Sequence, residues 1–175
     1  KNAEQLNNTK ARVITVDDKG NVDYMIYGYS KAKEHVGENG ISILRYNYES
    51  NSSKEAAFVP CKVPAYNLEK QLSQLCYVGD GTLYIMMNNT IYYANLKTKE
   101  WGALVENVED GSFAINSDGS MLAYNTSGKA YDTENITIVN LKKGEKKTIE
   151  AGADNIITVY GYTGTNLIYG IGSQS

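Results

Sequence analysis

The feature that most constrains this chain is the segment 113–150, which contains one full copy of a pattern that recurs in part elsewhere. It reads FAINSDGSMLAYNTSGKAYDTENITIVNLKKGEKKTIE. A short apolar segment comes first, a glycine turn follows it, and an apolar run comes after the turn. After a polar loop, an alternating strand runs into a lysine-rich turn. We interpret this order as a meander of four strands in under about forty residues, the length of one unit in a stacked repeat.

Two landmarks recur along the chain and alternate, with a glycine turn always first. The second landmark is an alternating strand that ends in Asn and in a turn that bears Lys or Glu. Glycine supplies the positive φ angles of tight hairpins, and alternation buries one face of each strand. The order therefore predicts repeated units that must stack on one another to bury their faces. The turn glycines are Gly20, Gly81, Gly119 and Gly164, and the matching asparagines are Asn47, Asn95 and Asn140.

These landmarks divide the chain into a lead-in and one β domain. We expect a flexible lead-in over residues 1–10, where the sequence is polar and without period, and a single β domain over 11–175. Residues 62–75 are the least β-like part. Leu68, Leu72 and Leu75 lie there at helical spacing, so that either a short helix capped by Asn67 or an extended crossing segment fits. The expected units cover 11–60, 68–108 and 109–152, with a partial unit over 153–175.

The run INSDGSMLAY, followed by ITIVNLKKGE, resembles the TolB-like, WD-like β-propeller repeat family. Blades of that family commonly show a Ser-Pro-Asp-Gly turn, a strand that ends in Ala and an aromatic residue, and a later strand that runs into Asp-Leu-x-x-Gly-Glu. In this chain Asn116-Ser117 replaces Ser-Pro, and Asn140 stands where Asp is common. The residues that match are Phe113, Asp118, Gly119, Ala123, Tyr124, Leu141, Gly144 and Glu145.

The resemblance implies an all-β fold of antiparallel, four-stranded, blade-like repeats. Closed propellers have at least about four blades, whereas the landmarks give about three and a half. We therefore expect a partial or fragmentary β-propeller, and a β-sandwich is the alternative fold. The residues of the family's repeat are structural, so the resemblance assigns no functional residue here.

Composition excludes several classes of partner. With 17 basic and 20 acidic residues the net charge is −3, which leaves no positive excess to neutralise phosphates, so we expect no nucleic-acid binding. No run approaches the roughly 18 apolar residues of a membrane span.

Cys61 and Cys76 lack metal-binding spacing, and they are either free thiols or paired with each other. The start at Lys1 indicates a processed or cut segment.

No catalytic or metal-binding constellation is visible, and we expect neither an enzyme nor a cofactor. The single histidine, His35, sits in a charged loop without a located nucleophile or carboxylate partner. The excess of tyrosine, 15 residues, has two readings: packing between blades, or an exposed aromatic surface for a partner. Under the second reading, the candidate surface residues are Tyr27, Tyr29, His35, Tyr46, Tyr92 and Tyr162.

These observations favour a non-enzymatic binding or protein-interaction module of a larger extracytoplasmic bacterial protein, secreted or anchored at the cell surface. The expected partner is a protein, or else a carbohydrate or peptide ligand. The remaining blades would lie in the parent protein or in a second molecule. One alternative is the accessory, substrate-gating propeller part of a hydrolase or peptidase whose catalytic residues lie outside this chain. A second is an assembly scaffold.

Overall fold

The computed structural model describes residues 10–29, 34–63 and 65–173. Within this part, three four-stranded antiparallel sheets and one two-stranded sheet follow one another along the chain. Lys10, the last residue of the expected lead-in, is the first residue of β1, and residues 1–9 lie outside the described part. No helix among the described residues is long and apolar enough to cross a membrane.

The strands of each sheet stand side by side in the order in which the chain makes them. The first sheet contains β1 (Lys10–Val16), β2 (Val22–Tyr29), β3 (Asn39–Asn47) and β4 (Ser52–Pro60). The second contains β5 (Cys76–Gly79), β6 (Thr82–Met87), β7 (Thr90–Asn95) and β8 (Trp101–Val105). The third contains β9 (Phe113–Ile115), β10 (Met121–Asn125), β11 (Asn135–Asn140) and β12 (Glu145–Glu150). The last contains β13 (Asn155–Thr163) and β14 (Asn166–Ser173).

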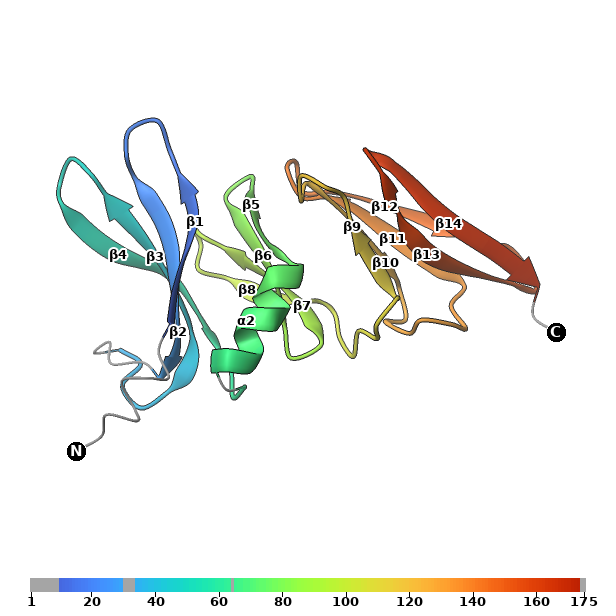
Figure 1. Cartoon of the computed structure of the whole chain (residues 1–175), viewed down its shortest axis with the longest axis horizontal. Coiled ribbons are helices and arrows are strands. Elements are labelled where there is room, and N and C mark those ends of the chain that lie inside the picture. Colours follow the sequence, from blue (N-terminus) through green and yellow to red (C-terminus); the bar gives the residue numbers. More distant parts are fainter. Residues whose placement is uncertain (1–9, 30–33, 64, 174–175) are drawn as a thin grey trace.

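The chain is an all-β partial propeller of antiparallel blade-like repeats, as the sequence predicts. Figure 1 shows the sheets in a row, from the blue first sheet to the red β13–β14 hairpin, each turning a face toward the next. First strands lie near one another, because β1 contacts β5 and β9 contacts β13. Four successive sheets packed face to face are not the two stacked sheets of a sandwich, so the alternative fold is wrong.

The glycine turns occupy the same place in every sheet. Each joins the first strand to the second, and the φ angles are 78° at Gly20, 68° at Gly81, 76° at Gly119 and 63° at Gly164. Positive φ strains residues that carry a Cβ but not glycine. The predicted role of these four glycines is confirmed.

The matching asparagines likewise share one role, at the end of the third strand. The Asn47 Oδ1 accepts a hydrogen bond from the Ser50 N–H at 2.8 Å, and the Asn95 Oδ1 accepts from Lys97 and Thr98, both at 2.9 Å. The Asn140 Oδ1 accepts from the Lys143 N–H at 3.2 Å. A side-chain oxygen therefore closes the turn into the fourth strand in all three complete sheets.

Three apolar cores fill the spaces between neighbouring sheets. The first lies between the first and second sheets, the second between the second and third, and the last between the third sheet and the β13–β14 hairpin. The fully buried Asn125 also ties the last pair together, because its Oδ1 accepts from the Val159 N–H and its Nδ2 donates to the Thr158 hydroxyl, both at 3.0 Å.

The helix α2 (Ala65–Gln74) lies between the first two sheets, where the sequence allowed either a helix or an extended crossing (Figure 1). Leu68 and Leu72 are buried in the core between those sheets, so their helical spacing reflects the buried face of this helix. The helix already includes Ala65, so the expectation that Asn67 caps it is wrong; Asn67 is an exposed residue within the helix.

Glycines also mark close approaches within and between sheets. A Cβ at Gly79 would lie 2.7 Å from the Leu141 carbonyl carbon, so the second and third sheets touch at backbone distance there. Tyrosine rings cover other glycines: a Cβ at Gly102 would lie 2.9 Å from the Tyr93 hydroxyl, and one at Gly170 would lie 2.6 Å from the Tyr160 ring. Packing thus uses part of the tyrosine excess.

Candidate binding surfaces

The six residues proposed from the sequence as a partner surface are scattered over the first, second and last sheets. Tyr27 is 3% exposed and belongs to the core between the first two sheets, so it offers no accessible surface. The side chain of Tyr29 lies outside the described part. Tyr46 is partly buried and donates its hydroxyl to the Asn51 Oδ1 at 3.1 Å.

The remaining two tyrosines pack against the cores that lie between neighbouring sheets. Tyr92 lies against the first core, with its ring centroid 6.0 Å from that of the exposed Trp101. Tyr162 lies against the last core, and its buried hydroxyl has no hydrogen-bond partner among the described residues. Burial raises the pKa of Tyr162 to about 12. The tyrosines whose side chains the structure describes are therefore not brought together into one surface.

A polar groove runs between α2 and the loops of the second and third sheets. One part, of about 670 Å³, lies between α2 and the β6–β7 turn, and an adjoining part of about 570 Å³ continues along the β8–β9 loop. The two parts share Asn88, Asn89 and Asp110. Half of the twelve lining side chains are amides, namely those of Asn67, Gln71, Gln74, Asn88, Asn89 and Asn107.

The walls of this groove are tied together. The Gln71 Oε1 accepts from the Asn88 N–H, and the Asn89 carbonyl accepts from the Val108 N–H at 2.7 Å. Such amides can both donate to and accept from a peptide or a sugar. The lining contains only Val63 and Val108 as apolar residues, so the groove lacks the aromatic or large apolar anchor that dominates most protein interfaces.

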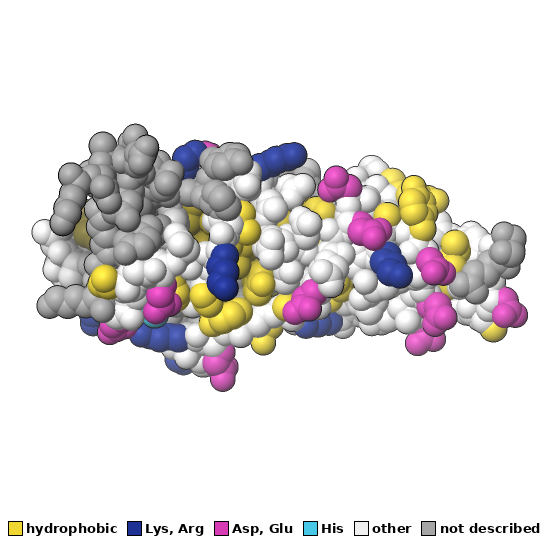
Figure 2. Space-filling view, turned by 90° about the horizontal axis from the view of Figure 1, so that it is seen from below, with side chains coloured by type: hydrophobic (Ala, Val, Ile, Leu, Met, Phe, Trp, Pro, Cys, Tyr) yellow, Lys and Arg dark blue, Asp and Glu magenta, His cyan; other side chains and the backbone are white. Residues whose placement is uncertain are grey.

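Charge is unevenly spread over one face of the molecule. Figure 2 shows this face from below Figure 1, and acidic side chains predominate over its right-hand half, which belongs to the C-terminal sheets. Hydrophobic and basic side chains are interspersed nearer the centre.

The outer hairpin of the row exposes a group of large apolar side chains. Tyr160 is 70% exposed, Ile168 48%, Tyr169 40% and Ile171 53%. Within the described part of the chain, β14 pairs with β13 alone, so one edge of β14 has no strand beside it. Exposed apolar side chains along an unpaired strand edge are typical of a site where another β-strand binds.

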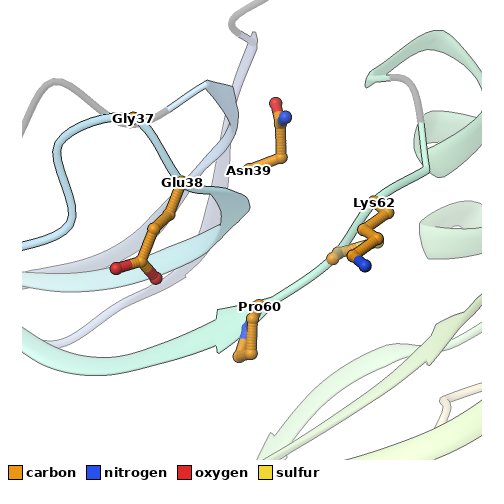
Figure 3. A pocket seen from close by; sticks show the side chains of 6 residues that line it. Gly37, Glu38, Asn39, Pro60 and Lys62 are labelled. Carbon is orange, nitrogen blue, oxygen red and sulfur yellow. The ribbon is translucent and has the colours of Figure 1, made fainter.

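A shallow hollow of about 380 Å³ lies at one end of the first sheet, lined by Gly37, Glu38 and Asn39 on one side and Pro60, Cys61 and Lys62 on the other. Figure 3 shows that the Glu38, Asn39 and Lys62 side chains point in different directions. Polar groups do not converge there, so we assign this hollow no ligand.

The two cysteines, for which the sequence left pairing open, are both free thiols. Burial raises the pKa of the Cys61 thiol, against a smaller opposing effect of the Val63 N–H. Burial also raises the pKa of Cys76, which the nearby Arg12 lowers less strongly. Raised thiol pKa values mean little thiolate at neutral pH, so neither cysteine has the character of a reactive nucleophile.

His35 lies in a cluster that the sequence did not indicate. The ring stacks on Phe58 of β4, with centroids 3.8 Å apart and an angle of 9° between the planes. The His35 Nε2 lies 3.1 Å from the Glu55 Oε1, and its Nδ1 lies 3.7 Å from the Glu38 Oε2. The strand β4 thus supplies both the Glu55 carboxylate and the Phe58 ring that contact His35. Glu55 lies twenty positions after His35 in the chain.

Comparison with known proteins adds little to this picture. No protein-family model and no curated protein matches the chain. Among solved structures, the chain is similar to TolB from Acinetobacter baumannii, with 12% identity and a TM-score of 0.39. The match covers 94% of this chain and 41% of that chain. A likeness this weak decides nothing, and the blade-like fold is established by strand order and packing alone.

Proposed function

We propose that the chain is a non-enzymatic protein-interaction module of a larger extracytoplasmic bacterial protein, and that its β13–β14 hairpin is the part that binds. The observation that carries the proposal is the exposure of Ile168, Tyr169 and Ile171 along a strand with one unpaired edge. Ile168 lies on one face of the hairpin and Ile171 on the other, because successive side chains of a strand point to opposite faces, but both belong to the strand with the open edge. Exposed apolar side chains along an open strand edge are typical of a site where another strand pairs.

The sequence of β14 supports this assignment. Natural sheets protect edge strands with charged residues or proline, because an open edge pairs with other strands. β14 reads NLIYGIGS and contains neither. By contrast, β12, the last strand of the third sheet, reads EKKTIE and carries four charged residues. The edge of β14 is therefore suited to accept a strand, whereas β12 is protected.

The partner that fits this edge is an antiparallel β-strand or hairpin with apolar side chains. The three complete sheets each have four strands, so two more strands beside β14 would give the last sheet the same build. We propose that these strands come from further blades of the parent protein or from a second molecule. Main-chain hydrogen bonds would supply the pairing, and apolar contacts with Ile168 and Ile171 the affinity.

Two measurements test the proposal. Sedimentation velocity over a range of concentrations compares the chain with Ile171→Lys and with the control Thr148→Lys on exposed β12. Concentration-dependent dimers that Ile171→Lys alone abolishes would identify a second molecule as the partner. If the chain stays monomeric, the second measurement is hydrogen exchange of the β14 amides in the parent protein. Slow exchange there supports pairing with further blades. Exchange as fast as in the isolated chain refutes the proposal.

The cellular setting and the enzymatic alternative have separate tests. Protease added to intact cells should cleave an extracytoplasmic parent protein and spare a cytoplasmic control, and full resistance until lysis would contradict this location. A hydrolase-type nucleophile motif elsewhere in the parent protein, together with measured hydrolysis, would favour the accessory propeller of an enzyme instead.

A further inference from the structure

We propose that the loop 34–38 and strand β4 form a Zn²⁺ site whose ligands are the His35 imidazole and the Glu34 and Glu55 carboxylates. One ligand atom from each residue lies within 4.8 Å of the other two. Ligand atoms around a tetrahedral zinc, at the usual bond lengths, lie roughly 3.4 Å apart. Small side-chain rotations would therefore bring the three atoms into coordination distance.

The imidazole is already held in the orientation that a metal ligand needs. Stacking on Phe58 at 3.8 Å fixes the plane of the ring. The ring presents its Nε2 to Glu55 at 3.1 Å and its Nδ1 to Glu38 at 3.7 Å. Zinc-bound histidines typically donate a hydrogen bond from the second ring nitrogen to a carboxylate, which sets the tautomer and strengthens the metal bond. At 3.7 Å the Glu38 carboxylate lies just beyond hydrogen-bond distance and would have to move closer to serve in this way. Glu38 is thus a positioning residue, and not a ligand.

The charge of the cluster also favours a cation. Among the described residues, three carboxylates lie around the one imidazole, so acidic groups outnumber the basic one in this cluster. The side chains of His35 and Glu55 are only 23% and 20% exposed, so the Glu55 carboxylate is partly removed from water. A divalent cation would remove this excess.

The donor set favours a transition metal over Ca²⁺ and Mg²⁺, and among transition metals we propose zinc. Ca²⁺ and Mg²⁺ prefer oxygen ligands alone, whereas an imidazole nitrogen with carboxylates suits zinc. Three protein ligands leave a fourth position for water or for a group from a partner. Bound zinc would connect the loop 34–38 to β4 and so hold this end of the first sheet rigid.

The decisive experiment follows the imidazole itself, because His35 is the only histidine of the chain. The chain, freed of any histidine tag and dialysed against EDTA, is titrated with ZnCl₂ by calorimetry and by NMR of the imidazole nitrogens. We expect one Zn²⁺ per chain and a shift of the Nε2 resonance. His35→Ala should abolish binding, Glu38→Gln should weaken it by about 10–100-fold, and Glu150→Gln on β12 should leave it unchanged.

Two results with the unchanged chain and with His35→Ala would overturn the site. One is the absence of heat and of an Nε2 shift at millimolar Zn²⁺. The other is binding by His35→Ala as tight as that of the unchanged chain, which would assign the metal to surface carboxylates. If His35→Ala fails to fold, Glu55→Gln keeps the test decisive, because it retains the imidazole signal. An Nε2 shift by zinc in Glu55→Gln equal to that in the unchanged chain would refute the proposed ligand set.

Discussion

The substitution Gly79→Ala tests the packing of the second sheet on the third. A Cβ at this position would lie 2.7 Å from the Leu141 carbonyl carbon, 2.9 Å from the Lys142 Cα and closer still to the Leu141 carbonyl oxygen. Real Cβ atoms essentially never approach other atoms within 3.0 Å. Because the obstructing atoms are backbone, no rotamer change can relieve the clash, and the two sheets must separate.

Overpacking of a well-packed core costs typically about 1–3 kcal/mol, and a clash with backbone belongs at the upper end of that range. We therefore expect Gly79→Ala to lower the free energy of unfolding by about 3 kcal/mol. At roughly 2–4 °C per kcal/mol for a chain of this size, the melting temperature should fall by about 6–12 °C.

The assay is urea unfolding followed by the fluorescence of Trp101, the single tryptophan, which lies on β8 of the second sheet. The matched control is Gly161→Ala, where an added Cβ meets nothing within 4 Å and no positive φ is required. That control should stay within about 1 kcal/mol of the unchanged chain. Equal unfolding midpoints for the two variants would refute the close contact between these sheets.

Three further substitutions address single polar groups. Asn125→Ala leaves the Val159 N–H without its acceptor and should cost about 2–3 kcal/mol; faster hydrogen exchange of that amide is the specific readout, and unchanged exchange would contradict the assigned role. Tyr162→Phe removes a buried hydroxyl without a described partner and should stabilise by about 1 kcal/mol in thermal unfolding. Because the unfolded chain loses the Tyr162 proton near pH 10 and the folded chain only at about 12, stability should decrease across that window, and less steeply in the Phe variant. Asn95→Ala removes the acceptor of two turn amides and should cost about 1 kcal/mol by urea unfolding, whereas no loss would show that the turn closes without its side chain.

The elements that could be predicted from the sequence are those with a local physical cause. A glycine before an apolar strand satisfies a positive φ within the same few residues, as at Gly119. Likewise, the Asn95 side chain accepts hydrogen bonds from amides two and three positions later. Neither requirement depends on distant parts of the chain, so both landmarks could be read without knowing what packs against them.

The candidate surfaces depend on partners far away in the sequence, and this is why they could not be predicted. In β2 the buried Tyr27 follows the partly buried Ile26, and its burial depends on which face of β2 meets the second sheet, which the letters of the strand do not specify. The pairing of His35 with Glu55 depends on where the loop before β3 lies against β4. The apolar β14 edge could have been noticed as a strand without charge, NLIYGIGS, since that signal is present in the letters alone.

The order of the strands has a mechanical consequence. Every hydrogen-bonded strand neighbour in each sheet is also a neighbour in the chain, and different sheets meet through their faces. A pull on the two ends therefore loads the face contacts in series, and once one of them gives way the hairpins of that sheet can unzip strand by strand. Under such a force the chain would lengthen in steps, with one sheet unfolding at a time.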